Sequence, residues 1–478
     1  MDVFDITHAI ATKLPEIKSP KISPTAKERL IWTGVALVLF FLMYNTTAFG
    51  VIQQSTGFDF LQTITASKIG SLLTAGIGPI VFASIFLQLF NGAGLLNVDM
   101  KTKEGRQKFL EAQKVLTILL AFVEAIIFVM TGRTVLAAIA GMPESIIIPL
   151  VVLQIALGSI VIIYLDEILN KYGIGSAVSL FIAAGVSYAI MSGLTGLVFG
   201  ANGMIAAVAE GGAEALPNAI LALLPFFFTI VVFLVVVYAE GIRVEIPIAF
   251  ERVRGLVPKL PLKFFYTSNI PVIFASALLL NLQLFAGGLA GATYVIPGTD
   301  FDIMHAIGYV DSNHQLRDGL LYFITPVYGV GRGTIEQWTF LASAVTPLYG
   351  IPEYVHAITY ILFLCSFSVM FGLFWVEIAN MDAKSVAGQL SSSGLQIPGF
   401  RRDPRMLESL LQKHIYPLTI MGAFAVGLLA GLADLTGALG TGTGILLTVG
   451  ILYKMYEQME QMQMFELYPM LGKIAGSS

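Results

Sequence analysis

Long apolar runs separated by short polar segments dominate the chain. A helix that crosses a bilayer needs about 20 mostly apolar residues, and ten runs approach or exceed this length. We therefore predict membrane helices over residues 30–49, 74–93, 112–132, 145–168, 174–197, 218–240, 266–288, 352–377, 415–434 and 441–460. The fold class that this pattern indicates is an all-α polytopic membrane protein.

The stretch 57–89 departs from the pattern of uninterrupted runs. Residues 57–70 are only half apolar, and are too short and too polar to cross a bilayer. Residues 77–89 are strongly apolar but follow a joint that contains Gly76, Gly78 and Pro79. We expect a broken helix with a short amphipathic half and a membrane half. Because non-helical backbone at membrane depth must be buried or must line water, the break predicts an internal cavity.

Composition supports a membrane protein. The chain has 478 residues, of which 56% are hydrophobic and 12% charged, and its mean hydropathy is +0.81. A soluble domain carries nearer 25% charged residues. The single cysteine, Cys365, excludes an intramolecular disulfide.

The first 29 residues are polar and basic, so we expect no cleavable signal peptide there. Val3, Ile6, Ile10 and Leu14 fall on one helical face. This spacing favours an amphipathic helix at the membrane surface; a frayed terminus is the alternative.

The distribution of basic residues sets the orientation of the ten helices. With a cytoplasmic N-terminus, 23 of the 27 Lys and Arg residues fall on the cytoplasmic side. Those left outside are Lys68, Arg133, Arg317 and Arg332. This asymmetry follows the positive-inside rule and predicts a multi-pass protein of the cell membrane with both termini cytoplasmic. An even number of helices also permits two halves of five, 1–209 and 210–478.

Two cytoplasmic loops, 239–264 and 380–414, are long and basic. Alternating apolar residues at Ile242, Val244 and Ile246 suggest a short hairpin in the first loop. The basic residues either contact anionic lipid or dock an anionic partner such as ribosomal RNA. The outer segment 289–351 is rich in Gly, Tyr and Pro, and we interpret it as a packed cap.

Sequence motifs for catalysis are missing. No HExxH, P-loop or GxSxG pattern occurs, so we expect neither an enzyme nor a bound metal, cofactor or nucleotide. The glycine-rich stretches 329–333 and 440–444 are interpreted as points where helices begin or end. Glu124 is the clear intramembrane carboxylate and is either a proton relay or a polar tie between helices. We favour a tie, with Asn281 as the natural partner and Gln88 and Gln283 as further candidates.

Several segments carry a resemblance to a known family. Residues 71–89, SLLTAGIGPIVFASIFLQL, resemble the second membrane segment of SecY, the pore subunit of the protein-conducting translocon. Further similar segments follow in order at 172–187, 238–249, 268–278 and 437–458. The archaeal and eukaryotic branch is the most similar. The resemblance implies two inverted five-helix halves around a central hourglass pore.

The resemblance also implies roles for particular residues. An apolar ring at the waist of the pore corresponds to Ile77, Val81, Ile174, Val178, Ile273 and Leu447. The plug would comprise Phe58, Asp59, Phe60, Leu61, Thr63, Ile64, Thr65, Ala66, Ser67, Lys68 and Ile69. A lateral gate facing lipid would include Phe82, Ser84, Gln88, Glu124 and Asn281. Phe82 departs from the small hydroxyl residue common in the family at that position.

On this basis we expect a passive conduit for secretory polypeptides, with a gate that releases apolar segments into lipid. The implied partners are the SecE and Sec-beta small subunits, the ribosome, signal sequences, nascent polypeptides and membrane lipid. The docking bases would be Arg243, Arg252, Arg254, Arg401, Arg402 and Arg405. The alternative is an inverted-repeat secondary transporter for a small solute, which would need polar groups at the membrane midplane.

Overall fold

Helices dominate the computed structural model. It describes residues 3–21, 24–52, 59–92, 94–96, 98, 102–132, 134–137, 142–200, 203–211, 215–247, 249–250, 259–288, 294–295, 302–310, 316–327, 334–392, 395–396 and 404–467. The helices of the first part are α1 (Val3–Ala11), α2 (Ala26–Asn45), α3 (Asp59–Ile64), α4 (Gly78–Gly92), α5 (Lys103–Met130), α6 (Glu144–Tyr172), α7 (Ala177–Phe199) and α8 (Met204–Glu210). Those that follow are α9 (Ala215–Ala222), α10 (Leu224–Glu240), α11 (Ile270–Gly288), α12 (Ile303–Ile307), the 3₁₀ turn η1 (Tyr322–Ile324), α13 (Thr334–Ser343), α14 (Glu353–Ile378), α15 (Ala383–Ser392), α16 (Pro404–Asp434) and α17 (Gly442–Leu467).

Six helical stretches within the described residues are long and apolar enough to cross a membrane, by length and composition. They are Glu104–Met130, Glu144–Tyr172, Ala177–Ala209, Ala215–Glu240, Glu353–Ser391 and Arg405–Asp434. Gly78–Asn91 and Ile270–Gln283 are shorter apolar helices. The polytopic helical class is therefore confirmed, whereas the full number of ten crossings stays a prediction.

Proline and glycine positions explain where helices begin and break. The expected break between the amphipathic and membrane halves is present, because α3 and α4 are separated by non-helical residues 65–77. The membrane helix predicted over 218–240 corresponds to the apolar stretch Ala215–Glu240, which is divided into α9 and α10 at Leu223. Pro225 lies in the first turn of α10, where its ring would clash with the Leu221 carbonyl of a continuous helix.

The strands form short antiparallel pairs. These are β1 (Val51–Ile52) with β2 (Val135–Leu136), β3 (Arg243–Pro247) with β5 (Lys259–Lys263), β4 (Ala249–Phe250) with β8 (Leu395–Gln396), and β6 (Tyr309–Val310) with β7 (Leu316–Asp318). The β3–β5 pair, with Arg243 opposite Lys263, confirms the hairpin predicted in the first basic loop. The β4–β8 pair joins this loop to the second basic loop.

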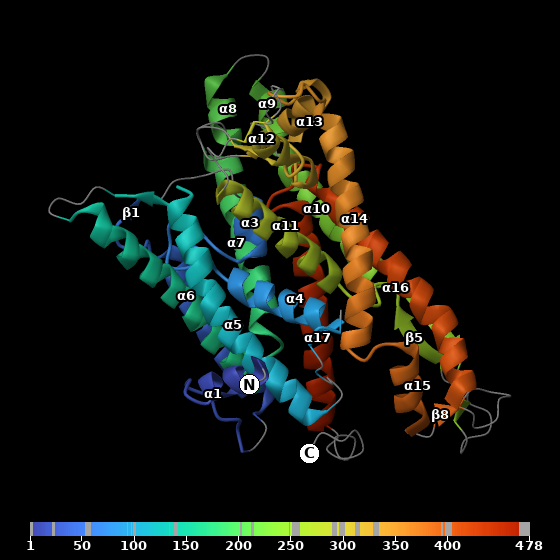
Figure 1. Cartoon of the computed structure of the whole chain (residues 1–478). Helices are drawn as coiled ribbons and strands as arrows, with labels where there is room; N and C mark the ends of the chain where they lie inside the picture. Colours follow the sequence, from blue (N-terminus) through green and yellow to red (C-terminus); the bar gives the residue numbers. More distant parts are fainter. Residues whose placement is uncertain are drawn as a thin grey trace.

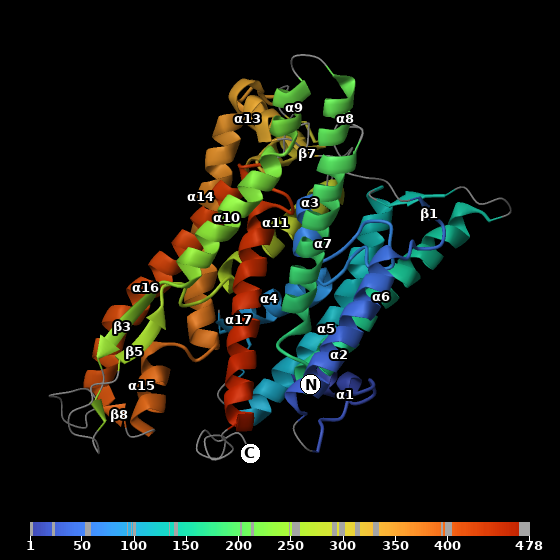
Figure 2. The same cartoon turned by 180° about the vertical axis from the view of Figure 1, so that it is seen from behind.

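The helices form two outer groups with a central group between them (Figures 1 and 2). α2, α5 and α6 form one side and α14 and α16 the other, with α4, α7, α11 and α17 between them. One large apolar cluster connects α2, α4, α6, α7, α11, α14, α16 and α17, and α5 packs through two smaller clusters. The amphipathic helix predicted at the N-terminus is α1, whose Phe4 packs on Phe109 of α5. α1 and the last turns of α17 lie at the same end of the molecule (Figure 1).

Candidate pore and lateral gate

Five of the six residues expected in the pore ring belong to, or pack against, one large apolar cluster. Ile77 precedes α4, and Val81, Val178, Ile273 and Leu447 lie on α4, α7, α11 and α17. Ile77, Val81 and Leu447 are buried members of one apolar cluster, and Val178 and Ile273 pack against it. The side chains come from segments far apart in sequence, so only the fold brings them together.

Ile174 lies apart from this cluster. It is buried in the turn between α6 and α7, and its N–H donates to Oγ1 of Thr33 in α2 at 3.2 Å. The structure thus ties Ile174 to α2, and Ile174 is not a member of the apolar cluster that contains Ile77.

A half-buried carboxylate positions the start of α7, on which Val178 lies. Asp166 of α6 accepts hydrogen bonds from the N–H groups of Ala177 and Val178, at 3.1 and 3.3 Å. Ser176, at the N-cap, makes no side-chain cap hydrogen bond. Asp166 therefore satisfies helix donors that otherwise have no partner, and it fixes α7 against α6.

The segment expected to be the plug fills the space between the ring helices. Phe58 lies outside the described residues, and α3 contacts α7, α11 and α17. The side chains from Thr63 to Ile69 are buried except that of Lys68. Thr65 and Ser67 share a buried hydrogen bond of 2.6 Å, so the polar residues of this segment are satisfied locally.

The same segment is fastened to the end of α2. The N–H of Ala48 donates to Gly70 O at 2.9 Å, and that of Leu72 donates to Thr46 O at 3.0 Å. Lys68 Nζ reaches Oδ1 of Asn45 at 3.5 Å and lies 5.7 Å from the centre of the Tyr44 ring. These contacts hold residues 59–70 in one position relative to the helices.

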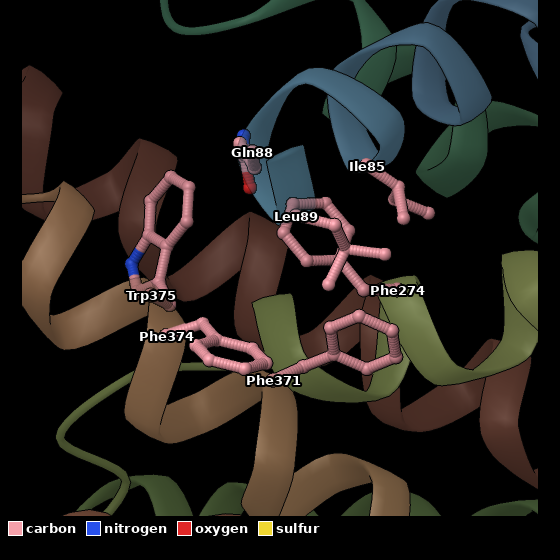
Figure 3. Close-up of a pocket in the computed structure, with 7 residues that line it drawn as sticks. All are labelled: Ile85, Gln88, Leu89, Phe274, Phe371, Phe374 and Trp375. Carbon is pink, nitrogen blue, oxygen red and sulfur yellow. The ribbon is translucent and has the colours of Figure 1, made fainter. Parts of the chain in front are cut away.

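The helices expected to form the lateral gate are in contact with one another in this structure. α4 contacts both α11 and α14, and a small pocket between them is lined by Ile85, Gln88, Leu89, Phe274, Phe371, Phe374 and Trp375 (Figure 3). Gln88 Nε2 donates to Ser84 Oγ within α4 at 2.9 Å. Phe82 is buried and packs edge-on against Phe86 with ring centroids 4.3 Å apart. Aromatic side chains therefore close the seam between the helices.

The hydrogen bond expected between Glu124 and Asn281 is not formed. Both side chains are buried, but Asn281 Nδ2 donates to the carbonyl of Ala277 on its own helix at 2.8 Å. Within the described residues, Glu124 Oε1 has no hydrogen-bond partner. Its Oε2 instead lies against Gly78. A Cβ added to Gly78 would be 2.7 Å from this oxygen. The prediction of a tie was wrong because helical position does not fix the direction in which a side chain points.

The docking bases are only partly described. Arg252, Arg254, Arg401 and Arg402 lie outside the described residues, and Arg405 is exposed at the start of α16. Arg243 donates to the Tyr453 hydroxyl at 3.0 Å and to Glu457 at 3.5 Å. Lys263, on the opposite strand, bonds the same Glu457 at 2.5 Å. The base of the hairpin is thus bound to α17, the helix that carries Leu447.

One buried polar cluster was missed from sequence. Asp434, at the end of α16, accepts from the Tyr360 hydroxyl of α14 at 2.7 Å and from the Thr443 hydroxyl of α17 at 2.5 Å. The N–H of Thr443 donates to the other carboxylate oxygen at 2.8 Å. The signal available was the position of Asp434 before the glycine-rich stretch 440–444, which lets α17 begin close to the carboxylate.

These features define a polytopic helical membrane protein with an apolar centre, the class to which channels for polypeptides belong. The SecY family model matches residues 71–456. The chain is 42% identical to the protein translocase subunit SecY of Methanocaldococcus jannaschii, over 97% of this chain and 98% of that protein. It is 38% identical to the SecY of Pyrococcus furiosus over 100% of both chains.

Solved structures give the same result. A structure titled as that of a protein conducting channel matches with a TM-score of 0.78 and 40% identity, covering 96% of this chain and 98% of its own. Sec61 in the canine ribosome-channel complex matches with a TM-score of 0.75, 40% identity and the same coverage. This chain belongs to the SecY family. It is therefore a translocation channel and not an enzyme.

Proposed function

We propose that secretory polypeptides cross the membrane passively through the apolar cluster of this protein-conducting channel. The observation that carries the proposal is the meeting of Ile77, Val81, Val178, Ile273 and Leu447 in one core, directly beside the plug segment. A collar of aliphatic side chains excludes water and ions when it is closed. Because it offers no hydrogen bonds, it discriminates little between the side chains that pass.

The plug and the gate complete this mechanism. Residues 57–70 seal the outer side of the collar, and Ile174 joins the ring when the α6–α7 turn moves. A signal sequence or an apolar nascent segment separates α4 from α11 and α14 and leaves through the seam into lipid. Phe82, Ser84, Gln88, Glu124 and Asn281 form the gate lining, with Glu124 and Asn281 acting separately.

The partners follow from the charged surfaces. The matching canine Sec61 was solved in a ribosome-channel complex, and the basic loops 239–264 and 380–414 suit an RNA-rich surface. Arg243, Arg252, Arg254, Arg401, Arg402 and Arg405 are the docking residues in this proposal. SecE and Sec-beta subunits brace the chain from outside, and the driving energy comes from the partner.

The membrane topology belongs to the same proposal. Ten helices cross the bilayer, in inverted halves 1–209 and 210–478 around an hourglass pore, with both termini cytoplasmic. The support is the charge asymmetry of the sequence and the location of α1 and the end of α17 at one end of the molecule (Figure 1).

Reconstitution tests the function. Proteoliposomes containing the complex with its small subunits are given ribosomes that carry an unfolded secretory chain. The expected result is that the chain becomes protected from protease inside the vesicle. Saturable uptake of a small solute without any protection of polypeptide would contradict the proposal and favour a secondary transporter.

A further inference from the structure

The turn between α13 and α14 exposes apolar side chains at the end of the molecule opposite α1. Val345, Leu348 and Tyr349 are 58%, 45% and 43% exposed, and Tyr354 in the first turn of α14 is 55% exposed. Glu353 is the only acidic or basic residue between positions 337 and 354 of the sequence. Its side chain is buried. We call the four exposed residues the apolar turn patch.

The charge of Glu353 is hidden by specific partners. Its Oε1 accepts from the Tyr322 hydroxyl at 2.8 Å, and its Oε2 lies 3.0 Å from Nδ1 of His356. The other ring nitrogen of His356 lies 2.8 Å from the carbonyl oxygen of Thr325. Burial, followed by the neighbouring Glu353, raises the pKa of Tyr322 far above its usual value, so its hydroxyl remains a donor. The carboxylate is thus turned into the cap, away from the patch.

The N–H groups of the turn have acceptors within the protein. The buried carboxylate of Asp318 accepts from the N–H groups of Leu348 and Tyr349, each at 2.9 Å. The other N–H groups of residues 346–351 bond within the turn: Thr346 to Ile351 O, Gly350 to Thr346 O and Ile351 to Thr346 Oγ1. Pro347 has no N–H group. A water-facing turn can leave such donors to solvent, whereas a turn in contact with lipid must satisfy them internally.

Neighbouring contacts place this region at the boundary of the apolar spans. Trp338 of α13 is 45% exposed, and its Nε1–H donates to Leu435 O, just after α16, at 3.0 Å. Its ring packs edge-on against Phe228 with centroids 5.4 Å apart. Phe228 lies inside the apolar span Ala215–Glu240. α13 lies beside the start of α14 (Figure 1), so the patch is level with the ends of membrane helices.

We propose that the apolar turn patch inserts into the interface of the membrane leaflet opposite α1, where phospholipid headgroups meet acyl chains. Trp and Tyr favour this depth, and an uncharged apolar surface whose N–H groups have internal acceptors suits it. The patch would hold the outer end of the gate helix α14 at a fixed depth. This inference depends on the protein being in a bilayer and does not depend on how polypeptides cross it.

Depth-dependent quenching tests the proposal. In the full chain with Cys365→Ala, the substitution Leu348→Cys or Tyr349→Cys supplies a single cysteine, which carries an environment-sensitive fluorophore. The labelled protein is placed in phosphatidylcholine nanodiscs. Glu336→Cys is the matched control, because Glu336 is exposed on α13 and points about 200° away from Trp338. We expect lipids with a doxyl group at acyl carbon 5 to quench both patch labels strongly, and aqueous iodide to quench them about threefold less than the control.

Two outcomes would overturn the proposal. If iodide quenches the patch labels as strongly as the label at position 336, the turn lies in water. If the labels resist iodide and are also insensitive to doxyl lipid, a protein covers the patch. In the same labelled chains, Asp318→Ala should move the Leu348 label toward water by removing the acceptor for two N–H groups; an unchanged doxyl signal would contradict the backbone argument.

Discussion

Close contact between backbone segments shapes the centre of the protein at the scale of single residues. Gly76 has φ +54°, and a Cβ added there would lie 2.2 Å from the carbonyl oxygen of Thr65. The same carbonyl accepts the N–H of Ile77 at 2.8 Å. The segment proposed as the plug and the first residue of the proposed ring are therefore in direct contact, and only glycine permits it.

We expect Gly76→Ala to destabilise the closed protein by about 2 kcal/mol, since the new methyl group must displace Thr65 and the backbone must keep a positive φ. The thermal midpoint should fall and the resting ion conductance in planar bilayers should rise. Gly34→Ala in α2 is the control, because nothing lies within 4 Å of its added Cβ. Equal midpoints and equal conductance for the two variants would show that the contact at Gly76 is unimportant.

The sequence could not predict which side chains of the site contact each other. Glu124 and Asn281 are both buried polar residues on neighbouring helices, as expected, yet Asn281 bonds to Ala277 and Glu124 faces Gly78. A sequence gives the helical face of a residue only when the rotation of each helix about its axis is known. That rotation is set by packing across the whole bundle.

At the scale of elements, the plug segment is short but strongly held. Its contacts are to α7, α11 and α17, the helices that carry ring residues, and to the end of α2. Most of the apolar core is built by the long helices around this segment, which contributes Ala66 to it.

Deleting residues 57–70 should therefore leave the fold intact and make the closed channel leaky to ions. Folding is measured by thermal unfolding in detergent and leakage by single-channel conductance. We expect a thermal midpoint close to that of the intact chain, together with long-lived open events. Conductance that stays at the intact level would rule out the segment as a seal.

The positions of the helices were more predictable from the sequence than the breaks within them. The apolar runs located helices at each expected segment, because a bilayer imposes one length on its spans. The division of 218–240 at Leu223 follows from Pro225, a signal that was present in the sequence but outweighed by the apolar run. The hydrogen bond from Ile174 to Thr33 could not be predicted, since the two residues lie in segments far apart in the sequence.

At the scale of the whole molecule, the two basic loops act as one surface. β4 and β8 pair across the loops, and the hairpin base is bound to α17 through Glu457. Positive charge concentrated at one end of the molecule can bind an anionic partner. The hydrogen bonds of Arg243 and Lys263 to Glu457 connect this end to α17, the helix that carries Leu447.

Reversing Arg401, Arg402 and Arg405 to Glu should weaken ribosome binding by about tenfold or more and flatten its dependence on salt, because fewer counterions are released from RNA. Co-sedimentation at several salt concentrations measures both quantities. Lys13→Glu, in the N-terminal segment, is the charge control and should bind normally. Unchanged affinity and an unchanged salt slope in the triple variant would mean that another surface docks the ribosome.

The central claim is that a translocating chain passes between the aliphatic side chains of the core. Photo-crosslinking amino acids at Ile77, Ile273 and Leu447, in the complex with a stalled ribosome and nascent chain, test it most directly. Val38, which is 61% exposed on α2, serves as the lipid-facing control. The account predicts strong crosslinks from all three core positions and about tenfold less from Val38, as expected for a side chain that faces lipid. Crosslinks no stronger than those of Val38 would contradict it.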